Sequence, residues 1–219
     1  MKQIKSIEAK ADQANQLLQN NRTQEACDIF LDVWEDLKGL MQQGSLKDIE
    51  ELQAAYPWKD FIVNWVQDIE QELHNAGIEN QVYFNKRIQY CEELLARASA
   101  TDQLTIENTR RAIADSHSAL GHAEECDRLY QCWLNDDPTW GLGYIGWSDC
   151  YHFGFGNKEI DQAKAARIIS QAFAVADLQD RSLPLRQREE VQKMLRKIDW
   201  PNFGRRLQDE YSMHAEITR

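Results

Sequence analysis

One aspartate and one histidine in this chain are spaced in a way that could do acid–base chemistry. Asp149 and His152 stand three residues apart, so on a helix they would share one face, where a carboxylate can orient an imidazole. No nucleophile accompanies them, because Cys150 would point about 100° away from Asp149. The chain also has no phosphate-binding glycine loop, HExxH or CxxC. We therefore predict a non-enzymatic protein without catalytic residues, and keep an enzyme using Asp149 and His152 only as the last alternative.

A second pair has the spacing of two metal ligands on one helix. His122 and Cys126 are four residues apart, which places both side chains on the same face. A stable site needs further ligands, and the sequence offers no second pair to complete it. We predict that the protein holds no metal and no cofactor.

Composition sets the class of protein that could position such residues. The 219 residues include only four prolines and ten glycines, which favours helices over a β-sandwich or barrel. No apolar run approaches the roughly 20 residues of a membrane span, and the start resembles no signal peptide. Five cysteines, an odd number, suit a reducing compartment. We expect a cytoplasmic protein without membrane contact.

Charge is unevenly distributed along the chain. The net charge of −11 opposes general binding to nucleic acid. Residues 181–206 nevertheless contain eight basic and three acidic residues, whereas residues 45–80 contain eight acidic residues and two lysines. The simplest interpretation is that the basic segment packs on, or is steered toward, an acidic body.

Apolar residues recur at helical spacing along the whole chain. The expected helices cover residues 3–19, 23–40, a short stretch opened by Gly44-Ser45, 57–77, 80–98, 102–121, 122–135, 140–154, a ninth segment to about 176, 182–199, and a weaker segment after Pro201. Thr23 and Asp102 are expected to cap their helices, and Gly77 is expected to end one. Helices joined by such short turns indicate a bundle or a solenoid.

The helix expected at residues 140–154 contains an unusual number of glycines. Around a helix, Trp140, Tyr144, Trp147 and Tyr151 fall on one stripe, and Gly143, Gly146, Cys150 and Gly154 on another. We interpret the aromatic stripe as core. The bare stripe predicts a close approach by a neighbouring helix, with Gly146 at the contact, because packing there can offset the cost of glycine.

Small and large residues at fixed offsets resemble a tetratricopeptide repeat. The 34-residue unit at 107–140 has small residues where its helices would cross and large ones beside them; weaker matches precede and follow it. The residues that carry the three matches are Ile113, Ala114, Cys126, Tyr130 and Trp133; Ala14, Asn21, Ala26, Phe30 and Val33; and Tyr144, Trp147, Ser148 and Tyr151, followed by Ala165, Ile169 and Ala172. The resemblance implies stacked antiparallel hairpins, with Cys126 as a small apolar residue at a crossing.

Two longer strings resemble the helical-repeat part of bacterial proteins that often end in a SEC-C zinc motif. They are VQDIEQELHNAGIENQVYFNKRIQYCEELL and WLNDDPTWGLGYIGWSDCY, within a similarity over residues 55–200. The resemblance implies a fold more than an activity. The chain ends QDEYSMHAEITR, without the cysteines of the zinc motif, so a metal function is not implied.

The tetratricopeptide resemblance also implies a concave groove lined by the first helix of each repeat. Seven residues stand at its lining positions: Asn108, Arg111, Asp115, Leu142, Ile145, Asp149 and His152. An apolar floor with two carboxylates would suit a basic or amphipathic peptide. A solvated surface without a ligand is the alternative for the same residues.

We therefore predict an all-α protein whose antiparallel helical hairpins stack as a tetratricopeptide-like right-handed solenoid. Residues 1–219 would form a single domain. Its parts would be a first hairpin at 1–44, divergent helices at 45–100, two repeat units at 101–178 and basic capping helices at 179–219. The predicted function is a non-enzymatic adaptor that binds a protein or peptide in the groove. A regulatory sensor that responds to a peptide or ligand is the alternative, and the sequence leaves the partner and the oligomeric state open.

Overall fold

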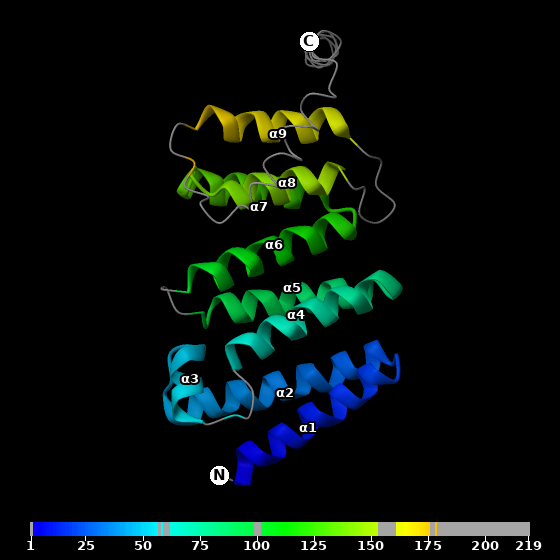
Figure 1. The fold of residues 1–219 in the computed structure, drawn as a ribbon, viewed down its shortest axis with the longest axis vertical. Helices are drawn as coiled ribbons and strands as arrows, with labels where there is room; N and C mark the ends of the chain where they lie inside the picture. Colours follow the sequence, from blue (N-terminus) through cyan, green and yellow to red (C-terminus); the bar gives the residue numbers. More distant parts are fainter. Residues whose placement is uncertain are drawn as a thin grey trace, which may run out of the picture. The chain divides into compact units, whose positions relative to one another are not determined.

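The structure of the protein is a computed structural model that describes residues 2–56, 58, 62–98, 102–152, 161–175 and 178. All regular elements in these residues are α-helices (Figure 1), which confirms the predicted all-α class for this part of the chain. The helices are α1 (Lys2–Gln19), α2 (Thr23–Gly44), α3 (Ile49–Ala55), α4 (Ile62–Glu79), α5 (Val82–Leu95), α6 (Gln103–Ala119), α7 (Ala123–Asp136), α8 (Gly141–His152) and α9 (Gln162–Ala174). The helices predicted after residue 180, and the basic segment 181–206, lie outside the described residues.

The chain packs as two compact units, Met1–Cys126 and Asp127–Arg219. The division falls within α7. The prediction of one continuous domain is not decided by this division and stays a prediction.

The first unit is built from helices that follow one another and pack as neighbours. α1 and α2 form a hairpin, and α2 also packs on α4. α4 packs on α5, and α5 packs on α6. The short α3 contacts α4. Figure 1 shows α4, α5 and α6 alternating in direction. Between α2 and α5, the Trp34 and Tyr90 rings meet edge to face with centroids 5.3 Å apart, and both side chains are buried. Large side chains buried between packed helices therefore form the core of this unit.

A buried arginine connects three helices of the first unit. Arg87 on α5 is only 5% exposed; its Nε donates to Oε1 of Glu70 on α4 at 2.6 Å, and Nη1 donates to the Ser116 hydroxyl on α6 at 3.1 Å. Burial, reinforced by the nearby Arg87 cation, lowers the pKa of His74 on α4 to about 4. The guanidinium forks between two neighbours, which suits arginine better than lysine.

The helix boundaries correct two local predictions at the ends of α2. Thr23 is the first residue of α2, not its cap, and Arg22 before it makes no side-chain cap bond. Gly44 ends α2, and Ser45 follows in the left-handed conformation with φ 51°, so Gly44-Ser45 closes one helix instead of opening another. The next helix, α3, is capped by Asp48, which accepts from the Glu51 N–H at 2.8 Å.

The prediction for Asp102 is confirmed. Its side chain accepts from the Thr105 N–H at 3.1 Å and caps α6.

Gly77 does not end its helix as predicted. It lies buried inside α4, which continues to Glu79. A Cβ at Gly77 would lie 2.6 Å from the ring of Phe84 on α5. The glycine therefore makes room for an aromatic side chain of the neighbouring helix.

The second unit contains the aromatic stripe of α8. Trp140, just before α8, and Tyr144, Trp147 and Tyr151 on it are all buried, which confirms them as core. Tyr130 of α7 stacks on Trp147, with ring centroids 6.2 Å apart and planes 15° apart. α8 packs closely on α9.

At Gly143, the structure replaces the predicted close approach of a neighbouring helix with another explanation. A Cβ at Gly143 would overlap the ring of Trp140, three residues earlier, so this glycine accommodates a neighbour in its own segment and not another backbone. Gly146 is buried in α8, and its place at a close contact between helices stays a prediction.

Candidate functional site

Three of the predicted groove residues lie on α6 in the first unit. Asn108, Arg111 and Asp115 are half-buried, and their spacing puts them on one stripe of the helix. Ser118, the next position on that stripe, is fully buried, and its hydroxyl has no hydrogen-bond partner among the described residues. The part of this stripe that a partner could reach therefore ends near Asp115.

The other four predicted residues lie on α8 in the second unit. Leu142, Ile145 and Asp149 are half-buried, whereas His152 is the last residue of α8 and its side chain lies outside the described residues. The suggested pairing of Asp149 with His152 is therefore not described. Because the seven residues belong to two units, the common groove stays a prediction.

A polar network within the second unit connects α7, α8 and α9. The carboxylate of Asp127 on α7 accepts from Nε1 of Trp147 at 2.7 Å, the Tyr151 hydroxyl at 2.6 Å and Nζ of Lys164 on α9 at 2.5 Å. The same Nζ also lies 2.8 Å from the Tyr151 hydroxyl oxygen and 4.1 Å from the ring centroid. The sequence predicted both aromatic residues as core but did not show that their polar ends meet at one carboxylate.

A surface pocket with a volume of about 570 Å³ opens beside the C-terminal halves of α2 and α5 in the first unit. We call it the α2–α5 pocket. Its lining combines apolar and small residues with three cations and one carboxylate: Glu35, Lys38, Gly39, Met41, Gln42, Leu46, Lys47, Ala96 and Arg97. Its volume is that of a small-molecule site. None of its residues was among the predicted site residues.

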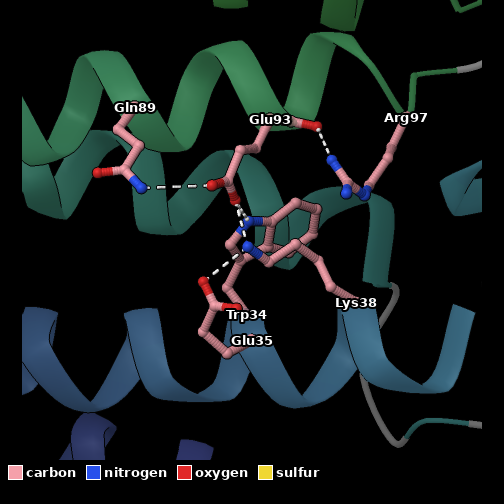
Figure 2. A network of polar contacts seen from close by, with 6 residues as sticks. All are labelled: Trp34, Glu35, Lys38, Gln89, Glu93 and Arg97. Carbon is pink, nitrogen blue, oxygen red and sulfur yellow. Dashed lines mark hydrogen bonds and ion pairs between the residues drawn. The ribbon is translucent and has the colours of Figure 1, made fainter. Parts of the chain in front are cut away.

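Lys38 is the best-anchored cation of this pocket (Figure 2). Its ammonium group donates to Glu35 at 2.6 Å and to Oε2 of Glu93 on α5 at 2.5 Å, and its side chain is 15% exposed. Burial acts to lower the pKa of Lys38, but the bonds to Glu35 and Glu93 outweigh it, so the pKa is raised. Lys38 therefore stays charged throughout the neutral range.

Glu93 is the centre of the polar network behind the pocket. Besides Lys38, it accepts from Nε1 of Trp34 at 2.9 Å and from Nε2 of Gln89 at 3.4 Å. Burial alone would raise the pKa of Glu93, yet these donors lower it. Figure 2 shows how side chains of α2 and α5 converge on this carboxylate.

The other two cations lie where the chain leaves its helices. Arg97, just after α5, donates from Nη1 to the Glu93 carbonyl at 2.7 Å, and its guanidinium lies 6.0 Å from the Trp34 ring centroid. Its own carbonyl accepts from the Ile49 N–H at 3.1 Å, which ties the start of α3 to the end of α5. Lys47 is exposed, and no ion pair of its ammonium group with the described residues is found.

The sequence carried one signal for this pocket, a glycine inside an otherwise regular helix. Gly39 stands in the last third of α2, and a Cβ there would meet nothing within 4 Å. A glycine inside a helix costs roughly 1 kcal/mol relative to alanine. At Gly77 the ring of Phe84 leaves no room for a side chain, whereas at Gly39 no neighbouring atom excludes one.

The described residues contain no group of three or more His, Cys, Asp or Glu side chains that could hold a metal ion. Cys126 of the suggested pair is buried, and His122 is exposed. Over the same residues, no helix has both the length and the apolar character to cross a bilayer.

No known protein family matches the chain, and no curated protein or solved structure matches it either. The tetratricopeptide and SEC-C resemblances therefore stay predictions, and the described helices alone define the fold.

Proposed function

We propose that the protein is a non-enzymatic helical adaptor that binds a basic or amphipathic segment of another protein. Its helical hairpins would belong to a tetratricopeptide-like solenoid, and α6 and α8 would each present a binding stripe.

The observation that carries the proposal is the half-buried polar stripe of α6. Asn108, Arg111 and Asp115 are reachable on one side of a helix whose neighbouring stripe, Thr105, Thr109, Ala112 and Ser116, is buried. A helix that is anchored on one side and polar on another is a rigid support for recognition. On α8, Asp149 adds a carboxylate beside the half-buried Leu142 and Ile145, a combination that suits an amphipathic basic peptide.

The experiment first identifies a binder and then measures it as a pure component. Partners are captured from the native host, and the affinity of a purified binder is measured for the native protein, Arg111→Ala and Asp149→Ala. Removal of a desolvated charge contact at an interface costs 2 kcal/mol or more, which is a loss of affinity of about 30-fold. We expect such a loss with an unchanged Tm.

Two matched variants serve as controls. Arg110→Ala removes a second arginine of α6 from a different side of the helix, and Asp136→Ala removes an exposed aspartate of α7. Both should keep full affinity. Unchanged affinity in Arg111→Ala and Asp149→Ala would exclude these stripes as the binding surface, and a collapse of Tm in both would show that the two residues are structural.

A further inference from the structure

We infer that the α2–α5 pocket is a binding site for a small organic anion, a molecule with an apolar body and a carboxylate or phosphate group. This site is separate from the proposed peptide-binding stripes and goes beyond the adaptor function.

The shape of the pocket supports a ligand with an apolar body. Met41, Leu46 and Ala96 contribute apolar surface to the lining, and the space of about 570 Å³ is adequate for a molecule of metabolite size. Gly39 faces open space at the position of its absent Cβ, so the missing side chain enlarges the cavity where a larger residue would occupy it. Burial of apolar ligand surface here would provide part of the binding free energy.

The charges of the lining define the polar part of the ligand. Lys38 is already paired with Glu35 and Glu93, so the cations of the lining that could bind an anion are Lys47 and Arg97, in a chain whose net charge is −11. Two neighbouring cations in an acidic protein can attract an anion locally, against the overall field. Carboxylate and phosphate groups are the usual partners of such side chains.

Several carbonyls at the ends of the two helices are already hydrogen-bonded and are therefore less available to repel an anion. The C-terminal carbonyls of a helix carry partial negative charge and would repel an anion if they were free. The Met41 and Gln42 carbonyls accept from the Leu46 and Ser45 N–H groups at 2.9 Å and 3.2 Å, and the Leu94 carbonyl accepts from the Arg97 N–H at 2.9 Å.

The cations have different roles in this arrangement. Lys38 is held by Glu35 and Glu93, and Arg97 is held against Trp34, so both are fixed before a ligand arrives. Lys47 at the rim is exposed and can turn toward a bound anion. Lys47 is therefore the charge whose removal tests recognition without disturbing the core.

The test uses a pair of dyes that differ by one anionic group. 8-Anilinonaphthalene-1-sulfonate has an aromatic body and a sulfonate, whereas N-phenyl-1-naphthylamine has the same body without it. Dye fluorescence is titrated with the full-length native protein and with Lys47→Glu. We expect the affinity for the anionic dye to fall about tenfold in Lys47→Glu and the affinity for the neutral dye to change less than twofold. Lys5→Glu, an equal charge change at an exposed position of α1, should leave both unchanged.

A second variant tests the cavity itself. Gly39→Leu places a side chain in the open space and should abolish binding of both dyes to the pocket, whereas Gly39→Ala should keep most of it. Unchanged binding of the anionic dye in both Lys47→Glu and Gly39→Leu would overturn the proposal. Displacement of the dye by an unstructured glutamate-rich peptide at lower concentration than by free octanoate would also overturn it, because the site would then serve a peptide.

Discussion

Glycines inside the helices of this protein have three different surroundings. Gly77 faces the ring of Phe84, Gly143 faces the ring of Trp140, and Gly39 faces open space. The first two are required by packing, because a side chain would collide with an aromatic ring. Gly39 is not, so the free energy that it costs α2 is not offset by any contact with a neighbour.

This contrast predicts opposite effects of the same substitution. Gly39→Ala should stabilise the protein by up to about 1 kcal/mol, because alanine favours the helix and restricts the unfolded chain. Gly77→Ala should destabilise it by about 1–3 kcal/mol, because the Cβ would overpack Phe84. Urea unfolding followed by circular dichroism measures both. Equal effects of the two substitutions would contradict the packing argument.

The polar network of Asp127 acts between whole helices. Its carboxylate joins α7 to two residues of α8 and one of α9, so a single side chain holds three elements of the second unit. Such a network stabilises when all its members are paired and becomes costly when one is lost.

Asp127→Ala should therefore destabilise the protein by about 2–3 kcal/mol, because Nε1 of Trp147 would lose its acceptor and Lys164 its counter-charge. Asp136→Ala, at an exposed aspartate of the same helix, should change stability by no more than about 0.5 kcal/mol. Chemical denaturation with matched buffers measures the two variants. A similar small effect in both would show that the network contributes nothing measurable.

Much of the element level was predictable from local chemistry. The apolar spacing of residues 3–19 and the cap at Asp102 agree with α1 and the start of α6, because both depend on neighbours along the chain. Gly77 was predicted to end a helix because glycine often does so. The Phe84 ring that explains it lies on another helix, and no spacing within α4 indicates it.

The candidate site was less predictable for the same reason. The predicted groove depended on the register of a repeat, which assigns positions along single helices. The α2–α5 pocket instead depends on Lys38, Glu93 and Arg97. Lys38 and Glu93 are 55 residues apart in the sequence, and they meet only because α5 packs on α2. Gly39 was visible in the sequence but had no distinguishing feature until its open surroundings were known.

At the scale of the whole molecule, the chain divides into two compact units, each with large buried aromatic residues. The first contains Trp34 and Tyr90, and the second contains Tyr130 and Trp147. Each of these ring pairs is formed within one unit, and a hydrophobic core of its own is a condition for a part of a chain to fold alone.

A fragment of residues 1–126 should therefore keep the helical circular dichroism expected for α1–α6 and unfold cooperatively with heat. The full chain is the control. An unfolded fragment would instead support the single domain predicted from the sequence, and would show that the first unit needs the second in order to fold.

The five cysteines differ in their exposure to solvent. All are free; Cys132 is exposed, and Cys27, Cys91, Cys126 and Cys150 are buried. Burial, helped by Glu72, raises the pKa of Cys27 to about 12, and burial raises the pKa of Cys91 further still, so these thiols are protonated as well as covered at neutral pH.

The rates at which the native cysteines react with a thiol reagent can therefore report on local opening, without any added cysteine. A maleimide label should enter at Cys132 alone and give a single spectroscopic reporter on α7. The remaining thiols would react only when their surroundings open, Cys27 and Cys91 with the first unit and Cys150 with the second. The order in which mass spectrometry detects these modifications would give the sequence of opening events along the chain.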